Sequence, residues 1–289
     1  MRDSVVPQRG ASLAIAAMLV GNAALALGPW MVRLAAIGPS ASAFWRLAIA
    51  LPFLFLIARM TGQPLPRQRR LWSILLVAGL FFAADLIAWH SGILLTKLAN
   101  AAMFGNVASF FFVAYGFIAA RRLPGRMQWI AMAMAATGVG LLLGRSYDLS
   151  PHYFAGDLLC LLGGLFYAGY LVAIDQARGR VPSWPSLAIS TGAGMMPLLL
   201  FALAVGPIIP QNWTPLILLA LGSQIIGQGL MVYAIGHLSP ILVGIGLLTQ
   251  PAIAAAIGWL AYGERMDALD LLGMVAIGIA VMLARASER

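Results

Sequence analysis

The chain has little charge, and this scarcity excludes a water-soluble fold. Only 9% of its 289 residues are Asp, Glu, Lys or Arg, whereas 62% are hydrophobic. A soluble domain carries about a quarter of its residues as charged side chains. A surface facing water cannot be built from this sequence, and the mean hydropathy of +0.92 indicates a protein immersed in lipid.

Motifs for catalysis and energy conversion are also missing. The sequence has no GxxxxGK[ST] segment, so it has no phosphate loop and does not read as an ATP-driven pump. HExxH and GxSxG are absent, and the three histidines lie far apart in the sequence. A single cysteine, Cys160, cannot form a disulfide within the chain. We therefore expect no enzyme activity, no metal and no cofactor.

Two other functional classes find weak support. A membrane-embedded enzyme would have to use Asp85, His90 and Ser91, and nothing in their spacing places a nucleophile beside a base. A channel would need a charged ring or a filter-like loop, and neither is apparent in the sequence.

What the chain does have is about ten apolar stretches of membrane-spanning length. A helix needs ~20 such residues to cross the hydrocarbon core. The spans are predicted near residues 12–32, 40–58, 72–92, 99–119, 127–144, 156–174, 185–205, 213–235, 241–261 and 267–284. The connections are short, which predicts a single all-α integral membrane domain over residues 1–289.

The distribution of positive charge predicts the orientation. With the N-terminus in the cytoplasm, 13 of the 18 lysines and arginines fall on the cytoplasmic side. Arg33, Lys97, Arg145 and Arg265 fall outside, and Arg46 lies within a span. This is the asymmetry that the positive-inside rule requires. The basic clusters therefore favour anionic lipid headgroups as neighbours, not nucleic acid, and both termini are expected in the cytoplasm of an inner (plasma) membrane protein.

The second half of the chain is a variation on the first. Residues 96–100 (TKLAN) pair with 236–240 (GHLSP), and the same offset of 140 pairs Gly138 with Gly278. Each half holds about five spans, and an odd number of crossings inverts the second half. The sequence thus predicts two five-helix repeats of inverted topology, over 11–145 and 155–285. Many secondary transporters have this architecture.

Several segments resemble a known family. Residues 236–240 (GHLSP), 249–265 (TQPAIAAAIGWLAYGER) and 273–283 (GMVAIGIAVML) are similar to the C-terminal repeat of the drug/metabolite transporter superfamily, EamA-like branch. Residues 44–48 (FWRLA), 20–22 (VGN) and 156–159 (GDLL) resemble other parts of the same pattern. The resemblance implies ten helices, alternating access and export of small metabolites, prominently amino acids. One departure is that Arg121-Arg122 stands where Gly263-Glu264-Arg265 stands in the second half.

Arg46 and Asp85 are the two charges placed well inside spans. Ionisable groups at such depth are costly and are usually paired or functional. At 1.5 Å per residue, both lie roughly 9–10 Å below the outer edge of neighbouring helices. We predict a buried ion pair, which serves either as a structural clamp or, through Asp85, in contact with substrate or proton. His90 lies slightly nearer the exit.

Polar side chains near the centre of the bilayer are the candidate substrate site. They are Asn22, Ser109, Tyr167, Gln224, Gln228, Thr249 and Gln250, joined by Trp89 and His90 close to Asp85. Substrates of inverted-repeat transporters bind at this depth. Hydrogen bonding between helices is the alternative role for each residue, because unpaired amides in hydrocarbon are costly.

These observations predict a secondary transporter that exports small metabolites, most simply neutral or aromatic amino acids, by alternating access through a central cavity. Efflux of drugs or aromatic cations on the same fold is the alternative. The sequence leaves open whether transport is coupled to protons or is facilitated diffusion. It also leaves open the oligomeric state.

Overall fold

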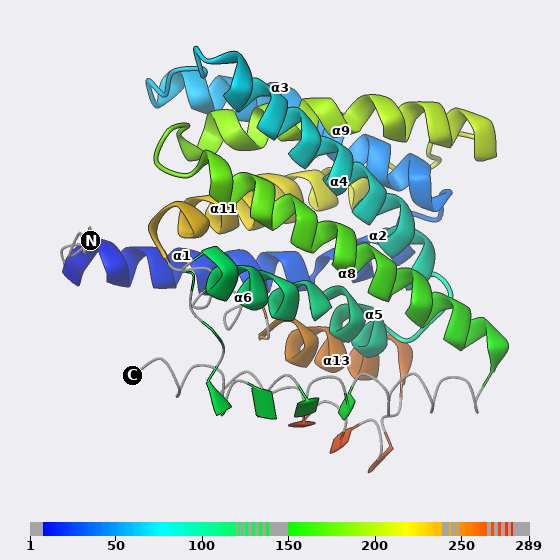
Figure 1. Cartoon of the computed structure of the whole chain (residues 1–289). Helices are drawn as coiled ribbons and strands as arrows, with labels where there is room; N and C mark the ends of the chain where they lie inside the picture. The colour runs from blue at the N-terminus through cyan, green and yellow to red at the C-terminus, as the bar shows by residue number, and fades with distance from the viewer. Residues whose placement is uncertain are drawn as a thin grey trace.

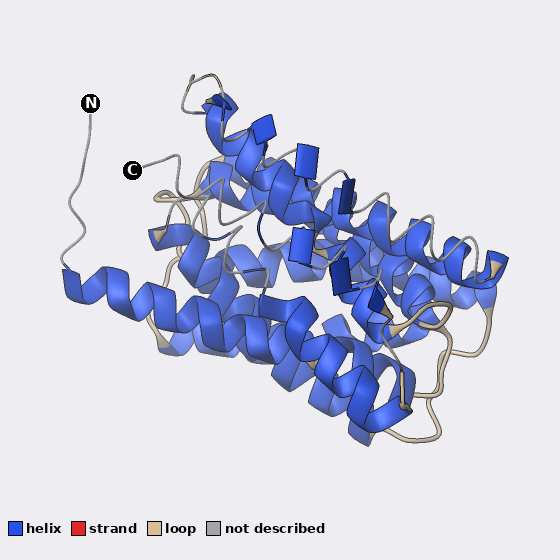
Figure 2. Cartoon of the chain, turned by 90° about the horizontal axis from the view of Figure 1, so that it is seen from below, coloured by secondary structure: helices blue, strands red, loops and turns tan. Residues whose placement is uncertain are grey.

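The computed structural model describes residues 8–119, 150–238 and 249–264, together with isolated residues from 121 to 138, at 243 and 247, and from 267 to 279. In these parts of the chain every regular element is a helix, and Figure 2 shows no strand among them. The helices, numbered as in Figure 1, run alongside one another in a single bundle.

The first half of the bundle contains α1 (Gln8–Ala26), α2 (Gly28–Leu34), α3 (Pro39–Met60), α4 (Arg69–Ile93), α5 (Leu98–Gly105) and α6 (Val107–Ala119). The second half contains α8 (Pro151–Ala177), α9 (Ser183–Val205), α10 (Thr214–Leu218), the π-helix η1 (Leu219–Gly227), α11 (Gln228–His237) and α13 (Thr249–Tyr262).

Seven of the predicted spans are helical and long enough to cross a membrane. These segments are Ser12–Leu34, Pro39–Met60, Arg69–Ile93, Leu98–Ala119, Pro151–Ala177, Ser183–Val205 and Thr214–His237. Helix α13 covers the second part of the predicted span 241–261. The predicted spans 127–144 and 267–284 lie outside the continuously described residues. The protein is therefore a multi-pass, all-helical membrane protein in the described part of its chain.

Proline and serine determine where several helices begin. The first span is broken at Leu27, directly before Gly28-Pro29, because Pro29 in the first turn of α2 has no N–H to continue the ladder. Helices α3 and α8 also begin with a proline. Ser150 caps α8, since its hydroxyl accepts a hydrogen bond from the His152 N–H at 3.1 Å.

Two further spans are irregular near their centres. Between α5 and α6, the side chain of Asn106 donates to the Ala102 carbonyl at 2.7 Å, and the same carbonyl accepts from the Asn106 backbone N–H at 3.0 Å. In the span Thr214–His237, nine residues, Leu219–Gly227, form the π-helix η1. Such π segments are frequent at functional sites, because they re-aim side chains within a helix.

Several contacts between a helix of the first half and a helix of the second half have an equivalent in which the two halves change places. Helix α4 packs on α8, and correspondingly α1 packs on η1 and α11. Helix α4 also packs on α9 as η1 packs on α3, while α5 packs on α8 as α13 packs on α1. Two equivalent halves related by a twofold axis would produce this pattern. The complete ten-helix inverted repeat stays a prediction, because its fifth and tenth spans lie outside the continuously described residues.

Glycines allow the central helix α4 to approach its neighbours closely. A Cβ added at Gly79 would lie 2.4 Å from the Ser190 carbonyl oxygen and 2.5 Å from the Ala193 Cβ on α9. On the other side of this crossing, a Cβ at Gly194 would lie 2.8 Å from the Gly79 carbonyl oxygen. Small residues at such crossings let backbones touch, which stabilises helix packing in lipid.

We expect Gly79→Ala to lower the free energy of unfolding by about 1–3 kcal/mol, because the added methyl group meets backbone atoms that cannot move aside cheaply. Thermal unfolding of the purified protein in detergent measures the effect. Gly222→Ala is the matched control, since its added Cβ has no atom within 4 Å. Equal melting temperatures for the two variants would contradict the tight crossing.

Candidate functional site

A small cavity lies where the two halves of the bundle meet. Its volume is about 40 Å³, which admits a few water molecules. Helices α1, α3, α4, α5 and α8 contribute to its wall, as do α11 and α13. The lining residues are Leu25, Arg46, Phe82, Asp85, Leu86, Trp89, Ala102, Gly105, Asn106, Tyr167, Gln228 and Gln250.

Arg46 enters this cavity from α3 and is almost fully buried. Its Nε donates to the Gln224 side-chain oxygen at 3.0 Å, and its guanidinium carbon lies 5.7 Å from the centre of the Phe82 ring. Gln224 is fixed in turn, because its amide nitrogen donates to the Thr191 hydroxyl at 3.0 Å. The arginine is therefore anchored through one nitrogen, while its side chain lines the cavity.

Asp85 reaches the same cavity from α4 and is 7% exposed. Gly163 on α8 gives it room, since a Cβ there would lie 3.2 Å from the Asp85 carboxylate. Within the described residues, no ion pair joins Asp85 to Arg46, so the expected direct pair is corrected. Gln224 provides the acceptor for Arg46, and the two charges line one cavity without touching.

The predicted polar residues form two links within the bundle. The Tyr167 hydroxyl on α8 donates to the Gln228 side-chain oxygen on α11 at 3.3 Å. The Gln250 amide on α13 donates to the Asn22 side-chain oxygen on α1 at 2.9 Å, across the two halves. Tyr167, Gln228 and Gln250 line the cavity, whereas Asn22 lies behind Gln250 and is fully buried.

Some of the other predicted residues line the cavity and others do not. Trp89 lines the cavity and donates its indole N–H to the Ala101 carbonyl at 3.1 Å. His90 points elsewhere and contacts the Ser42 hydroxyl at 2.8 Å, and Ser109 donates to the Asn106 carbonyl of its own span at 2.7 Å. Gln224 is not among the lining residues and instead accepts the hydrogen bond that anchors Arg46. The side chain of Thr249 lies outside the described residues.

Stacked aromatic rings form the wall beside Arg46. Phe82 stacks on Tyr170 with ring centres 4.8 Å apart, and Tyr170 stacks on Tyr167 at 5.6 Å. The described lining of the cavity therefore combines one cation, one carboxylate, side-chain amides and apolar or aromatic surface. Among the described residues, no group of three or more His, Cys, Asp and Glu side chains gathers in a way that could hold a metal ion.

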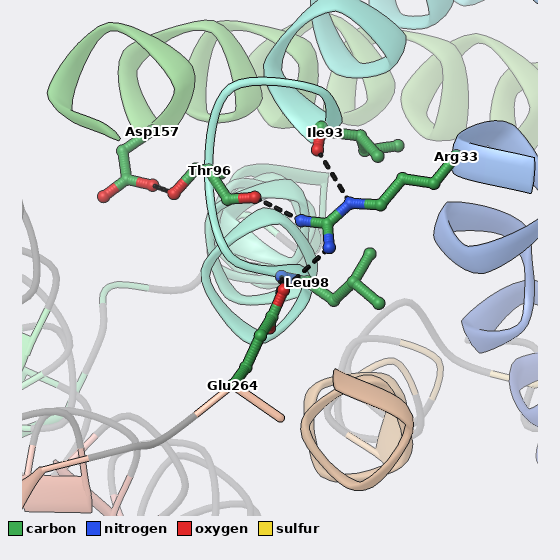
Figure 3. A network of polar contacts seen from close by, with 6 residues as sticks. All are labelled: Arg33, Ile93, Thr96, Leu98, Asp157 and Glu264. Atoms are coloured by element: carbon green, nitrogen blue, oxygen red, sulfur yellow. Dashed lines mark hydrogen bonds and ion pairs between the residues drawn. The ribbon is translucent and has the colours of Figure 1, made fainter. Parts of the chain in front are cut away.

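A second polar cluster lies at the end of the bundle predicted to face outward, and sequence reasoning missed it as a site. Arg33 at the end of α2 forms an ion pair with Glu264, which follows α13, at 2.7 Å (Figure 3). Thr96 lies beside them and donates its hydroxyl to Asp157 at 2.5 Å. The sequence predicted only that Arg33 is one of the outer positive charges. Glu264 was noted only within residues 263–265, which have no acidic counterpart in the first half.

The comparisons with known proteins show that this membrane protein is a transporter. The sequence matches the EamA-like transporter family twice, over residues 8–144 and 154–286. The chain therefore belongs to the EamA-like transporter family, and the resemblance drawn from the sequence is confirmed.

Two curated proteins and one solved structure are similar over most of the chain. Pseudopaline exporter CntI of Pseudomonas aeruginosa strain UCBPP-PA14 is 27% identical over 252 residues, which cover 85% of this chain and 86% of that protein. The protein of the same name from strain PAO1 is 28% identical with the same coverage. A crystal structure that is 18% identical aligns over 97% of both chains with a TM-score of 0.68, which establishes a shared fold.

We expect Gln224→Leu to lower the free energy of unfolding by about 1–3 kcal/mol, because Arg46 Nε and the Thr191 hydroxyl lose a buried partner. Thermal unfolding in detergent measures this change. Thr191→Val is the control that removes only the outer hydrogen bond, and we expect it to have the smaller effect. A Gln224→Leu protein as stable as the wild type would show that Gln224 does not anchor Arg46.

Proposed function

We propose that this protein is a secondary exporter that carries a small zwitterionic metabolite of the amino-acid class out of the cytoplasm. The observation that carries the proposal is that Arg46 and Asp85 line one cavity, with opposite charge, and form no ion pair with each other. A buried charge is costly until it has a partner. A solute that brings a carboxylate and an ammonium group can supply a partner to each.

The chemistry of the other lining residues fits the same class of solute. A guanidinium group binds a carboxylate through two parallel hydrogen bonds, and Asp85 can accept from an ammonium group. Gln228 and Gln250 offer further donors and acceptors. Trp89 and Tyr167 provide aromatic surface against which an apolar side chain can pack. Neutral and aromatic amino acids are therefore the leading substrates in this proposal.

The size of the cavity supports alternating access as the mechanism. A volume of about 40 Å³ is too small for an amino acid, so the bundle must open to admit one. In the proposal, two five-helix inverted repeats rock against each other around this site. The paired helix contacts and the two matched family segments support that arrangement. The breaks at Leu27 and at Asn106 supply places where spans can bend.

The direction and location of transport are also part of the proposal. Export is supported by the curated relatives, both of which are exporters. The excess of positive charge at one end of the spans supports cytoplasmic termini in the inner membrane. Efflux of aromatic cations is the alternative, but Arg46 in the cavity wall opposes a solute that carries only positive charge.

Counterflow in proteoliposomes tests the substrate class. After a screen of the twenty amino acids, the best substrate is compared with the amine that lacks the carboxylate and with the carboxylic acid that lacks the amino group. We expect wild-type protein to prefer the zwitterion roughly 10- to 100-fold, because a charge-assisted hydrogen bond contributes about 1.5–3 kcal/mol. Repeating the assay with and without a pH gradient separates proton coupling from facilitated diffusion.

The same assay tests the two charges. We expect Arg46→Gln to lose the preference for the zwitterion over the amine that lacks the carboxylate. We expect Asp85→Asn to lose the preference for the zwitterion over the acid that lacks the amino group. Arg59→Gln, at an exposed position of the same helix α3, is the control that should leave transport unchanged. Wild-type rates and preferences in both cavity variants, at normal expression, would remove the proposal.

A further inference from the structure

Arg33 is held at the predicted outer end of the bundle by partners from separate parts of the chain. Its Nε donates to the Ile93 carbonyl at 3.2 Å, and one terminal nitrogen donates to the Thr96 carbonyl (Figure 3). The other terminal nitrogen forms the ion pair with Glu264, 231 residues away in the sequence. Its guanidinium carbon also lies 4.9 Å from the centre of the Tyr262 ring. Arg33 thus joins α2, the α4–α5 connection and the end of α13.

The backbone after α13 is shaped to deliver the Glu264 carboxylate to this point. Gly263 has a φ of +62°, a conformation that favours glycine, and it turns the chain back over the helix end. Gly258 leaves the space that the carboxylate fills, since a Cβ there would lie 2.4 Å from Glu264 Oε2. The carboxylate also accepts from the Leu98 backbone N–H, at 2.9 and 3.2 Å for its two oxygens.

This ion pair lies between the central cavity and the predicted outer face of the bundle. Beneath it is an apolar cluster that includes Val32, Ile93, Leu98 and Phe104. Ala102, one turn further along α5, already lines the central cavity. Arg33 and Leu98 belong to the first half and Glu264 to the second, so the contact ties the two halves together. Movement of one half against the other at this end must break it.

Beyond the ion pair lies an outer vestibule of about 650 Å³. Among the described residues, its wall carries the basic side chains Arg33, Lys97 and His152, two tyrosines at 153 and 262, and one acid, Glu264. Side chains of Arg33 and Glu264 keep 18% and 14% of their surface exposed here. A basic, aromatic pocket whose arginine already holds a carboxylate has the chemistry of a carboxylate site.

We propose that this vestibule is a second carboxylate-binding site on the exit path, filled by Glu264 when the outer mouth is closed. The carboxylate of a departing solute replaces that of Glu264 on Arg33, and this exchange releases α13 from α2 and α5. No covalent bond changes, because one carboxylate takes the place of another. The identity of the solute rests on the proposed function, but the site and its gating do not.

Cysteine labelling tests the site without any transported solute. Cys160, the only cysteine of the chain, is replaced by alanine, and Ala102→Cys places a thiol in the central cavity. A membrane-impermeant maleimide is then applied to right-side-out and to inside-out vesicles. We expect slow labelling from the outer side in the otherwise unchanged chain. Glu264→Ala should raise that rate roughly five- to thirtyfold, as the loss of a partly buried charged contact predicts.

Acetate then serves as the probe of the carboxylate site. In the otherwise unchanged chain, added acetate should compete with Glu264 for Arg33 and raise the outer labelling rate, whereas chloride at equal ionic strength should not. In the double variant Arg33→Gln with Glu264→Ala, acetate should have no effect. Asp175→Ala is the matched control, because it removes an ion pair of 3.6 Å with Arg178 at the opposite end of the bundle. Its outer labelling should equal that of the parent.

Two results would overturn the proposal. Unchanged outer labelling in Glu264→Ala would show that the ion pair closes nothing, and an otherwise unchanged chain whose outer labelling acetate does not raise would show a clasp without a carboxylate site. Glu264→Gln, which keeps the size of the side chain, repeats the labelling test if the alanine variant is not monodisperse. Failure of Arg46 and Asp85 variants to alter transport would remove the proposed function and leave these labelling results standing.

A charge exchange gives an independent prediction. Arg33→Glu combined with Glu264→Arg keeps both charges, yet we expect outer labelling to stay as high as in Glu264→Ala. The reason is that a carboxylate at position 33 would face the Ile93 and Thr96 carbonyls, and an arginine at 264 would face the Leu98 N–H. Restored slow labelling would show that the pair acts through charge alone and would contradict a role for these carbonyls and the Leu98 N–H.

Discussion

The close packing of α4 against α8 and α9 is the constraint on which both polar clusters depend. Gly79 and Gly194 bring α4 and α9 together, and Gly163 on α8 leaves space for Asp85 and Trp89. In lipid there is no hydrophobic force between helices, so such backbone approach is a main source of packing energy. Because α4 is fixed along its length, Asp85 is aimed at the cavity and the Ile93 carbonyl at its end is presented to Arg33.

The second constraint is that polar groups within hydrocarbon must be satisfied. Most of the bundle obeys it through local or interhelical pairs, such as Gln250 with Asn22 and Tyr167 with Gln228. Arg46 is treated differently, because its Nε donates to Gln224 and no ion pair joins it to Asp85. The protein thereby keeps two opposite charges in one cavity, and a zwitterionic solute would match them.

The two clusters also describe the state of the molecule along the transport path. The central cavity is too small for a metabolite, and the Arg33–Glu264 pair joins the two halves at the predicted outer end. In the proposed transport cycle, both features would belong to a bundle closed toward that side. Helix irregularities beside the cavity, at Asn106 and in η1, lie where a rocking motion would need the backbone to yield. Packing therefore links the site to the movement that the proposal requires.

Much of the fold and part of the site could be predicted from the sequence. Apolar length alone located seven helical spans, because lipid demands about 20 apolar residues per crossing. Depth along a span could be counted, which placed Arg46, Asp85, Tyr167, Gln228 and Gln250 at the level of the cavity. The family resemblance, carried by the C-terminal segments, was confirmed by matches over both halves.

The sequence by itself determined which residues lie in lipid and at what depth, since these follow from the rise of a helix and the thickness of a bilayer. Only the tertiary structure decided which of them meet. Counting along a helix does not reveal the direction in which a side chain points, so His90 and Ser109 were placed in a site that they do not line. Nor could it pair Arg33 with Glu264, because contacts between distant segments arise only when helices pack.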